Sequence, residues 1–256
     1  MKIKPLQLYS LAAIVQIAGS SGAAMLAPFF MKDHGYSIAA ASVPLVVNGI
    51  GRVCSDLTSG VLASYFSSGM LIVAASAASI VAAALAHFFI ESPVVFMAAF
   101  TILGVTEAMF ALSIRKIAFE QSEPGQQGRV QGQVAAALGI GFSLGPLTSG
   151  FVGKLFGPQV LFAFYALPQV VGLILILLGG AHRSRAITQE ASVQLWREGK
   201  TLLTRASFLA SSLAVFQSFV MLVGVTRIAF PFLAVNQGYA LDWVGTAVAI
   251  SRMTDT

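Results

Sequence analysis

The sequence predicts an all-α integral membrane protein with about seven transmembrane helices, a truncated eighth helix and a cytoplasmic N-terminus. Of its 256 residues, 57% are hydrophobic and only 10% are charged, whereas about 25% of residues are charged in ordinary soluble domains. The mean hydropathy is +0.83. A soluble core of this size cannot bury so much apolar surface, so the composition argues against a water-soluble enzyme.

Segments long enough to cross a bilayer follow one another along the chain. A helix rises about 1.5 Å per residue, so crossing about 30 Å of hydrocarbon takes about 20 apolar residues. The first three candidates are residues 7–31, 37–63 and 57–90. Only the second carries charged residues, Arg52 and Asp56, and polar residues 64–69 mark the turn that follows it.

The second half of the chain continues the pattern. The next candidates are residues 94–114, which carry only Glu107, then 130–153 and 155–182, which carry no Asp, Glu, Lys or Arg, and 206–241, which carry only Arg227. An eighth apolar segment begins near Trp243 and is too short to cross. These runs are continuously apolar and about twice as long as barrel strands of about ten residues, so they are predicted to be helices.

The basic residues indicate how the chain is oriented. Short loops rich in Lys and Arg stay in the cytoplasm. With the N-terminus inside, ten basic residues lie in inner segments, whereas only Lys32 and Lys154 lie in outer loops. The net charge of +5 is therefore a topology signal, and no nucleic acid partner is expected. We expect a multi-pass protein of a bacterial inner (plasma) membrane, with the lipid bilayer as a partner.

The chain divides into three parts. Residues 1–180 are predicted to form a six-helix transmembrane bundle, residues 181–205 a cytoplasmic linker that includes an amphipathic helix, and residues 206–256 the start of a second bundle. The linker carries apolar Val193, Leu195 and Trp196 among charged residues, which is typical of a helix lying on the membrane face.

A weak internal repeat supports the second bundle. Residues 28–36 and residues 231–239 share Pro, Phe, Gly and Tyr at four places, each offset by 203. Arg52 aligns with Arg252 when the offset between the two repeats changes by three residues. Internal repeats are common in transporter folds. The chain would then need further C-terminal helices, or a second copy, to complete a cleft between two bundles.

Several motifs resemble those of the major facilitator superfamily. Residues 124–132 are similar to the loop between spans 4 and 5 of that family and include Arg129, and residues 141–150 are similar to its glycine-proline signature of span 5. Gly60 and Gly104 also fit family positions, whereas Ser64 and Phe100 stand where the family has an aspartate and an arginine. The resemblance implies a transporter built from two six-span bundles.

Four charged residues inside the predicted spans are the main candidates for contact with a substrate or a proton: Arg52, Asp56, Glu107 and Arg227. Charges at membrane depth cost about 3 kcal/mol or more, so they face a cavity or a partner. Arg52 and Asp56 lie one helical turn apart and either form a structural pair or act as a gate or anion-binding site. Glu107 either carries a proton, since low dielectric favours the neutral carboxyl, or forms a salt bridge with Arg52 or with another helix.

Polar and small residues form a second group of candidates. The polar residues expected to line a cavity are Gln16, Asn48 and Gln217. The residues expected to serve helix packing or gating are Gly60, Gly141, Gly145, Pro146 and Gly150. Small residues four apart let helices approach closely, and a proline removes a backbone hydrogen bond and can kink a helix.

The predicted function is secondary active transport of a small solute by alternating access, with a proton gradient as the energy source implied by the resemblance. No phosphate-binding glycine loop, Ser-His-Asp spacing or metal-ligand spacing occurs, so neither ATP-driven transport, an enzyme, a metal nor a cofactor is expected. The alternative is a non-transporting scaffold or assembly protein that keeps the fold, which the departures at Ser64 and Phe100 favour. A membrane enzyme that uses the inner-face charges is a remote third option.

Overall fold

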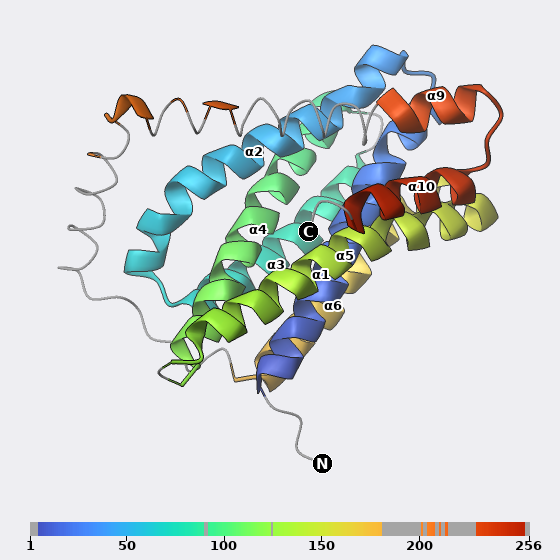
Figure 1. Ribbon diagram of the computed structural model, residues 1–256. Coiled ribbons are helices and arrows are strands. Elements are labelled where there is room, and N and C mark those ends of the chain that lie inside the picture. Colours follow the sequence, from blue (N-terminus) through green and yellow to red (C-terminus); the bar gives the residue numbers. More distant parts are fainter. Residues whose placement is uncertain are drawn as a thin grey trace.

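The computed structural model describes residues 5–89, 92–123, 125–180, 201, 204–207, 210, 213–214 and 229–253, and these residues contain helices and no strand. The helices are α1 (Pro5–Asp33), α2 (Ile38–Tyr65), α3 (Ser68–Phe88), α4 (Pro93–Glu120), α5 (Gln127–Phe156), the short 3-10 helix η1 (Pro158–Val160), α6 (Leu161–Leu178), α9 (Phe230–Asn236) and α10 (Leu241–Met253). Figure 1 shows the long helices side by side in one bundle, with α10 lying along α5.

The prediction of an all-helical membrane protein is confirmed. Five helices of the described part are long and apolar enough to cross a membrane: α1, α3, α4, α5 and the η1–α6 segment. Helix α2 is as long as α4 and carries Arg52 and Asp56. The seven-span count stays a prediction, because most of residues 206–228 lie outside the described part, as do residues 181–200 of the linker.

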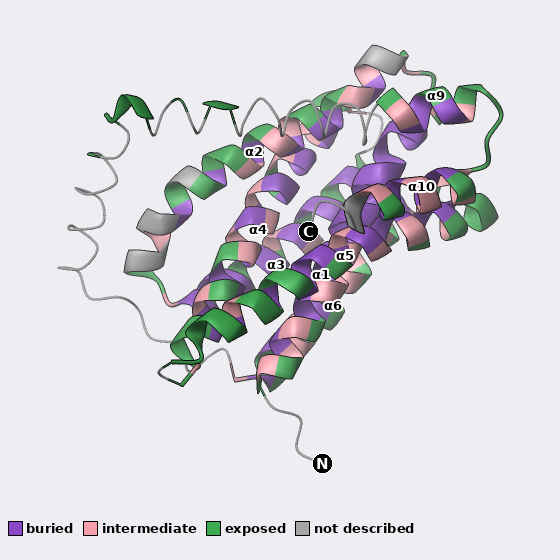
Figure 2. Ribbon diagram, in the orientation of Figure 1, coloured by how far each residue is buried: buried purple, intermediate pink, exposed green. Residues whose placement is uncertain are grey.

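Two apolar clusters hold the first six helices together. One contains the stacked rings of Phe30, Phe96 and Phe100, and the other surrounds Tyr9 and Ile114. Helix α1 packs against α5 and α6, α2 packs against α4, and α3 packs against α4 and α6. Buried residues concentrate along α1 in the middle of the bundle (Figure 2).

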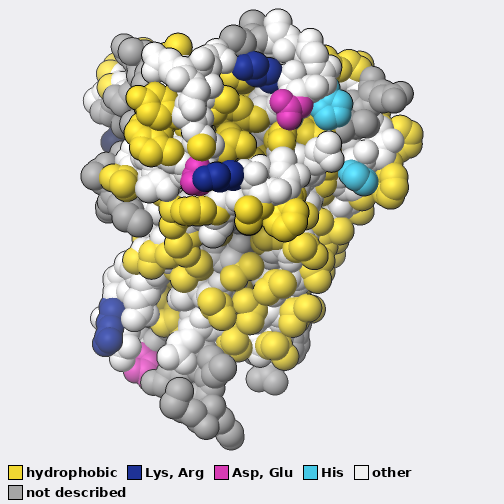
Figure 3. Space-filling model, turned by 90° about the vertical axis from the view of Figure 1, so that its right-hand side faces the viewer, with side chains coloured by type: hydrophobic (Ala, Val, Ile, Leu, Met, Phe, Trp, Pro, Cys, Tyr) yellow, Lys and Arg dark blue, Asp and Glu magenta, His cyan; other side chains and the backbone are white. Residues whose placement is uncertain are grey.

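The outer surface of the bundle is apolar as well. Leu155, Leu178 and Phe88 are 74%, 70% and 77% exposed, and hydrophobic side chains cover much of the face seen in Figure 3. Water would not favour such a surface, whereas lipid tails are as apolar as these side chains. The bundle is therefore built to be surrounded by lipid.

Helices α2 and α4 touch backbone to backbone. A Cβ atom on Gly104 would lie 2.8 Å from the carbonyl carbon of Asn48 and 3.1 Å from the amide nitrogen of Arg52, so no side chain fits there. The side-chain amide of Asn48 donates a hydrogen bond of 3.3 Å to the carbonyl oxygen of Phe100 at the same crossing. This close approach brings the residues that follow, Arg52 and Glu107, within reach of each other.

The internal repeat also exists in the backbone. Helix α1 ends at Asp33 and α9 ends at Asn236, again 203 residues later. The amide of Tyr36 donates to the carbonyl of Met31, as the amide of Tyr239 does to that of Ala234. Gly35 and Gly238 follow the two helices with φ of 82° and 90°, a conformation that glycine adopts readily. Two copies of one turn therefore lead into α2 and α10.

Candidate functional site

An ion pair between Arg52 and Glu107 lies in the middle of α2 and α4. Nη1 of Arg52 is 3.0 Å from Oε1 of Glu107, and the two side chains are 23% and 10% exposed. The guanidinium carbon of Arg52 also lies 5.5 Å from the ring centroid of Phe142 on α5, within the range of a cation–π contact. Three helices thus bring an acid, a base and an aromatic ring together at membrane depth.

Asp56 extends this cluster along α2 by one helical turn. Its side chain is exposed, and it takes part in none of the ion pairs found among the described residues. Arg52, Asp56 and Glu107 together carry one positive and two negative formal charges. Of these two acids, Glu107 is the one whose carboxylate lies within ion-pair distance of Arg52.

The polar candidates do not gather in one place. Asn48 is buried beside Arg52, one turn earlier on α2. Gln16 is 1% exposed, and its amide donates to Ser76 Oγ over 3.1 Å and to the Gln169 carbonyl over 3.3 Å. Gln16 therefore joins α1, α3 and α6 inside the bundle. Gln217 and Arg227 lie outside the described residues.

The glycines of α5 allow two different helices to pack closely against it. A Cβ on Gly145 would lie 2.5 Å from the carbonyl oxygen of Ala18 on α1, and a Cβ on Gly141 would lie 2.9 Å from Cβ of Ile17. A Cβ on Gly150 would lie 3.0 Å from Cα of Gly245 on α10, which also approaches the carbonyl of Pro146. These three glycines therefore lie where α5 closely approaches α1 and α10. Gly60 belongs to α2, and its surroundings are not described.

Three contacts join α9 and α10 to the first bundle at the end where α1 stops. Lys154 Nζ lies 2.8 Å from Asp242 Oδ2, and Lys32 Nζ donates to Asn236 Oδ1 over 2.6 Å. The rings of Phe29 and Phe232 lie 5.5 Å apart. The charge pattern predicts Lys32 and Lys154 only as outer-loop charges, and it does not predict these contacts. The signal was the repeat, since Phe232 follows Phe29 by 203 residues.

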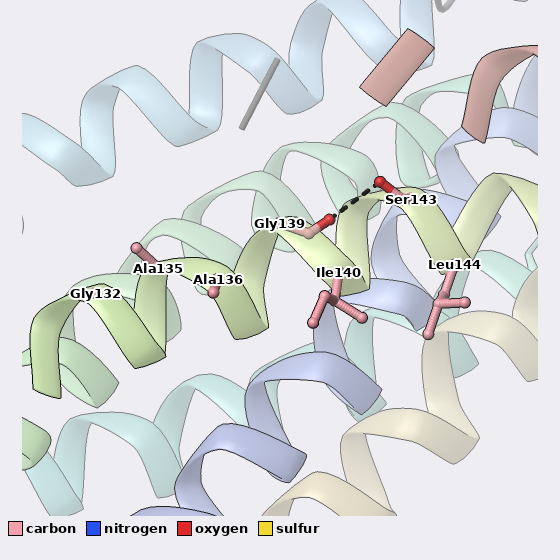
Figure 4. Close-up of a pocket in the computed structure, with 7 residues that line it drawn as sticks. All are labelled: Gly132, Ala135, Ala136, Gly139, Ile140, Ser143 and Leu144. Atoms are coloured by element: carbon pink, nitrogen blue, oxygen red, sulfur yellow. Dashed lines mark hydrogen bonds between the residues drawn. The ribbon is translucent and has the colours of Figure 1, made fainter. Parts of the chain in front are cut away.

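Two hollows lie along the outer side of α5. One has a volume of about 650 Å³ and is shown in Figure 4. Its lining consists of Gly132, Ala135, Ala136, Gly139, Ile140, Ser143 and Leu144. The Ser143 hydroxyl donates back to the Gly139 carbonyl over 3.2 Å, so this hollow offers few free polar groups. The other lies between the first turns of α1 and α5, and Arg129 is one of its lining residues.

Several solved structures share this fold. The chain superimposes on the POT family transporter PepTSo with a TM-score of 0.64 and 17% identity, covering 100% of this chain and 55% of that one. Tetrameric PepTSo2 superimposes with a TM-score of 0.61 and 16% identity, covering 91% of this chain and 55% of that one. A POT family transporter in complex with a thioalcohol-conjugated peptide superimposes with a TM-score of 0.61 and 12% identity, covering 86% of this chain and 49% of that one.

These similarities establish the fold, and the chain spans about half the length of those transporters. A search of curated proteins found no match. The sequence model of the Major Facilitator Superfamily matches residues 9–254, almost the whole chain. Together with the apolar helices, this match shows that the protein is a multi-pass integral membrane protein and that the chain belongs to the Major Facilitator Superfamily.

Proposed function

We propose that the protein is a secondary active transporter that moves a small solute by alternating access and is driven by a proton gradient. The observation that carries this proposal is the ion pair between Arg52 and Glu107, which is held at membrane depth against Phe142. Ionisable groups inside a membrane are costly and mark solute or proton pathways. The family membership supports transport in general.

Glu107 is the proposed proton carrier and Arg52 the proposed solute contact. When Glu107 is charged, it neutralises Arg52 and competes with any anionic group for the guanidinium. Protonation of Glu107 removes the negative charge and leaves Arg52 free to bind a carboxylate or phosphate, which guanidinium groups bind well. Proton binding and solute binding would thereby favour each other. Asp56 and Arg227 are proposed as further charges on the same path.

The contacts of α9 and α10 support alternating access. They join α9 and α10, the start of the proposed second bundle, to α1 and α5 at one end of the molecule, through Lys154–Asp242, Lys32–Asn236 and Phe29–Phe232. In an alternating-access cycle these contacts form while the opposite end is open and break when the bundles rock. Their polar members are exposed or lie at helix ends, so each costs little to break.

Flux into proteoliposomes tests the proposal. The full-length protein is reconstituted, a pH gradient is imposed, and uptake of peptides, carboxylates and phosphate esters is measured. Peptides come first because one solved relative holds a conjugated peptide. We expect Glu107→Gln to abolish gradient-driven uptake while solute exchange without a gradient continues. Glu120→Gln, the same change at the end of the same helix, serves as control. Flux that ignores the pH gradient in the wild type would overturn proton coupling.

The alternative is a membrane scaffold that keeps the fold without transporting. Phe100 favours it, because this residue stands where the family has an arginine and is 0% exposed, stacked on Phe96 with ring centroids 4.9 Å apart. A scaffold does not need the membrane-depth charges. If Arg52→Ala, Glu107→Ala and Arg227→Ala together leave the cellular phenotype intact, the scaffold replaces the transporter as the proposed function.

A further inference from the structure

A groove of about 770 Å³ lies between the first turns of α1 and the first turns of α5. Its lining is polar towards the helix ends and apolar further in. The residues that matter here are Ser10, Arg129 and Gln133 on the polar part and Leu11, Ile14 and Ile140 on the apolar part. The groove therefore matches an amphiphile, with a polar group at one end and a hydrocarbon chain at the other.

This groove faces away from the Arg52–Glu107 pair. Phe142 meets Arg52 on one face of α5. Ile140 lies two positions earlier, which rotates its side chain by about 200° around the helix axis. Helix α10 contacts α5 at Pro146, Gly150 and Gly153, nearer the other end of that helix, and none of its residues lines the groove. The groove is therefore separate from the proposed solute path.

Arg129 supplies the charge at the polar end. Its side chain is exposed, and none of the ion pairs found in the described part of the chain involves it. The nearby carboxylate of Glu123 accepts a hydrogen bond of 2.8 Å from Gln126, and Glu120 pairs with Lys116. Arg129 is therefore available to an external anion.

The length of the groove selects one kind of anion. Arg129 and Ile140 are eleven residues apart on one helix, which corresponds to about 16 Å. That is about half of a hydrocarbon core of about 30 Å, or one leaflet. A free phosphate would use only the polar end, whereas a phospholipid would fill the whole groove. This end of the bundle is the one expected to face the cytoplasm, where anionic lipids are concentrated.

We propose that the groove binds one anionic diacyl phospholipid. Its headgroup phosphate contacts Arg129, with Ser10 and Gln133 as hydrogen-bonding neighbours, and one acyl chain lies along Leu11, Ile14 and Ile140. The lipid site is independent of the transport proposal, because it lies on the opposite face of α5 and involves none of the charges assigned to the solute or the proton.

Native mass spectrometry of the full-length protein tests this site. The protein is released from nanodiscs that contain either phosphatidylglycerol or phosphatidylcholine, and retained lipids are counted. We expect one phosphatidylglycerol to be retained, and Arg129→Gln to weaken its binding about fivefold, as expected for one basic residue near an anionic lipid. Arg115→Gln, an exposed basic residue at the same end outside the groove, should leave it unchanged.

A second pair of variants tests the acyl chain. Leu11→Trp fills the apolar part of the groove and keeps Arg129, so it should displace the lipid. Leu112→Trp is the matched control, since Leu11 and Leu112 are 46% and 39% exposed and only Leu11 lines the groove.

The proposal is overturned by any of three results. Equal losses with Arg129→Gln and Arg115→Gln would indicate general surface charge. Equal retention of phosphatidylcholine would remove the role of the anion. Binding of inorganic phosphate that competes with lipid and survives Leu11→Trp would indicate a plain anion site.

Discussion

Arg52 and Glu107 are 55 positions apart in the chain and their side chains meet at 3.0 Å, one turn beyond the point where Gly104 lets α2 and α4 touch. Each charge would be costly at this depth without the other, and a side chain on Gly104 would push α2 and α4 apart. Packing and charge are therefore linked at this site.

The pair should show energetic coupling. We expect Arg52→Ala and Glu107→Ala each to lower thermal stability in detergent, and the double variant to lower it by less than their sum, with a coupling of about 0.5–3 kcal/mol, because each single change leaves an unpaired charge. Thermal unfolding of all four proteins gives this number. Strictly additive losses would show that the two groups do not interact in solution.

Gly104→Ala should disturb the site without touching a charge. The added methyl group meets the backbone of Asn48 and Arg52, so α2 and α4 must separate, at about 1–3 kcal/mol of overpacking. Gly49→Ala is the control, because nothing lies within 4 Å of a Cβ there. The two variants are compared by thermal unfolding and by flux. If both behave alike, the two helices do not touch as described.

Exchanging the charges of Lys154 and Asp242 should restore the flux that a single charge reversal lowers. The two groups form an ion pair of 2.8 Å in which Lys154 is 52% exposed, and such pairs contribute about 1 kcal/mol or less. Lys154→Asp should therefore slow flux moderately through repulsion, and Lys154→Asp combined with Asp242→Lys should recover it. Failure of the exchange to recover flux would show that the contact has no part in the cycle.

Gln16→Leu distinguishes packing from solute contact at this residue. The Gln16 amide makes two hydrogen bonds to neighbouring helices, and loss of these bonds should cost about 0.5–3 kcal/mol with no change in the apparent solute affinity. Asn48→Leu, beside Arg52, should by comparison alter that affinity. The measurement is the solute concentration for half-maximal flux, and a rise for Gln16→Leu would return this residue to the solute path.

Most of the helices follow from the sequence, and their ends follow less well. The windows 7–31 and 130–153 fall inside α1 and α5, because continuous apolar runs of that length form helices in lipid. The window 94–114 is shorter than α4, which continues to Glu120. Hydropathy detects where a segment leaves the hydrocarbon, whereas a helix continues through Arg115 and Lys116 as long as its backbone bonds continue.

The site follows from the sequence only in part. The rarity of charges in apolar segments pointed to Arg52 and Glu107 and to their pairing as one alternative. Gln16 was grouped with the cavity residues, although its amide bonds to α3 and α6. Periodicity shows that a residue lies on one face of a helix, but it does not show which neighbour covers that face. That information comes only from the order in which the helices pack.

The contact between Phe29 and Phe232 places a constraint on how the protein arose. These are equivalent residues of the two repeats, and their rings touch. Where a two-fold axis relates two repeats, a residue that touches its own counterpart lies close to that axis, as in the interface of a symmetric dimer. If the repeats descend from one ancestral half that assembled in pairs, this phenylalanine lay at the centre of that dimer. A single mutation there changed both sides of the contact at once, and after the gene was duplicated the two sides became free to diverge.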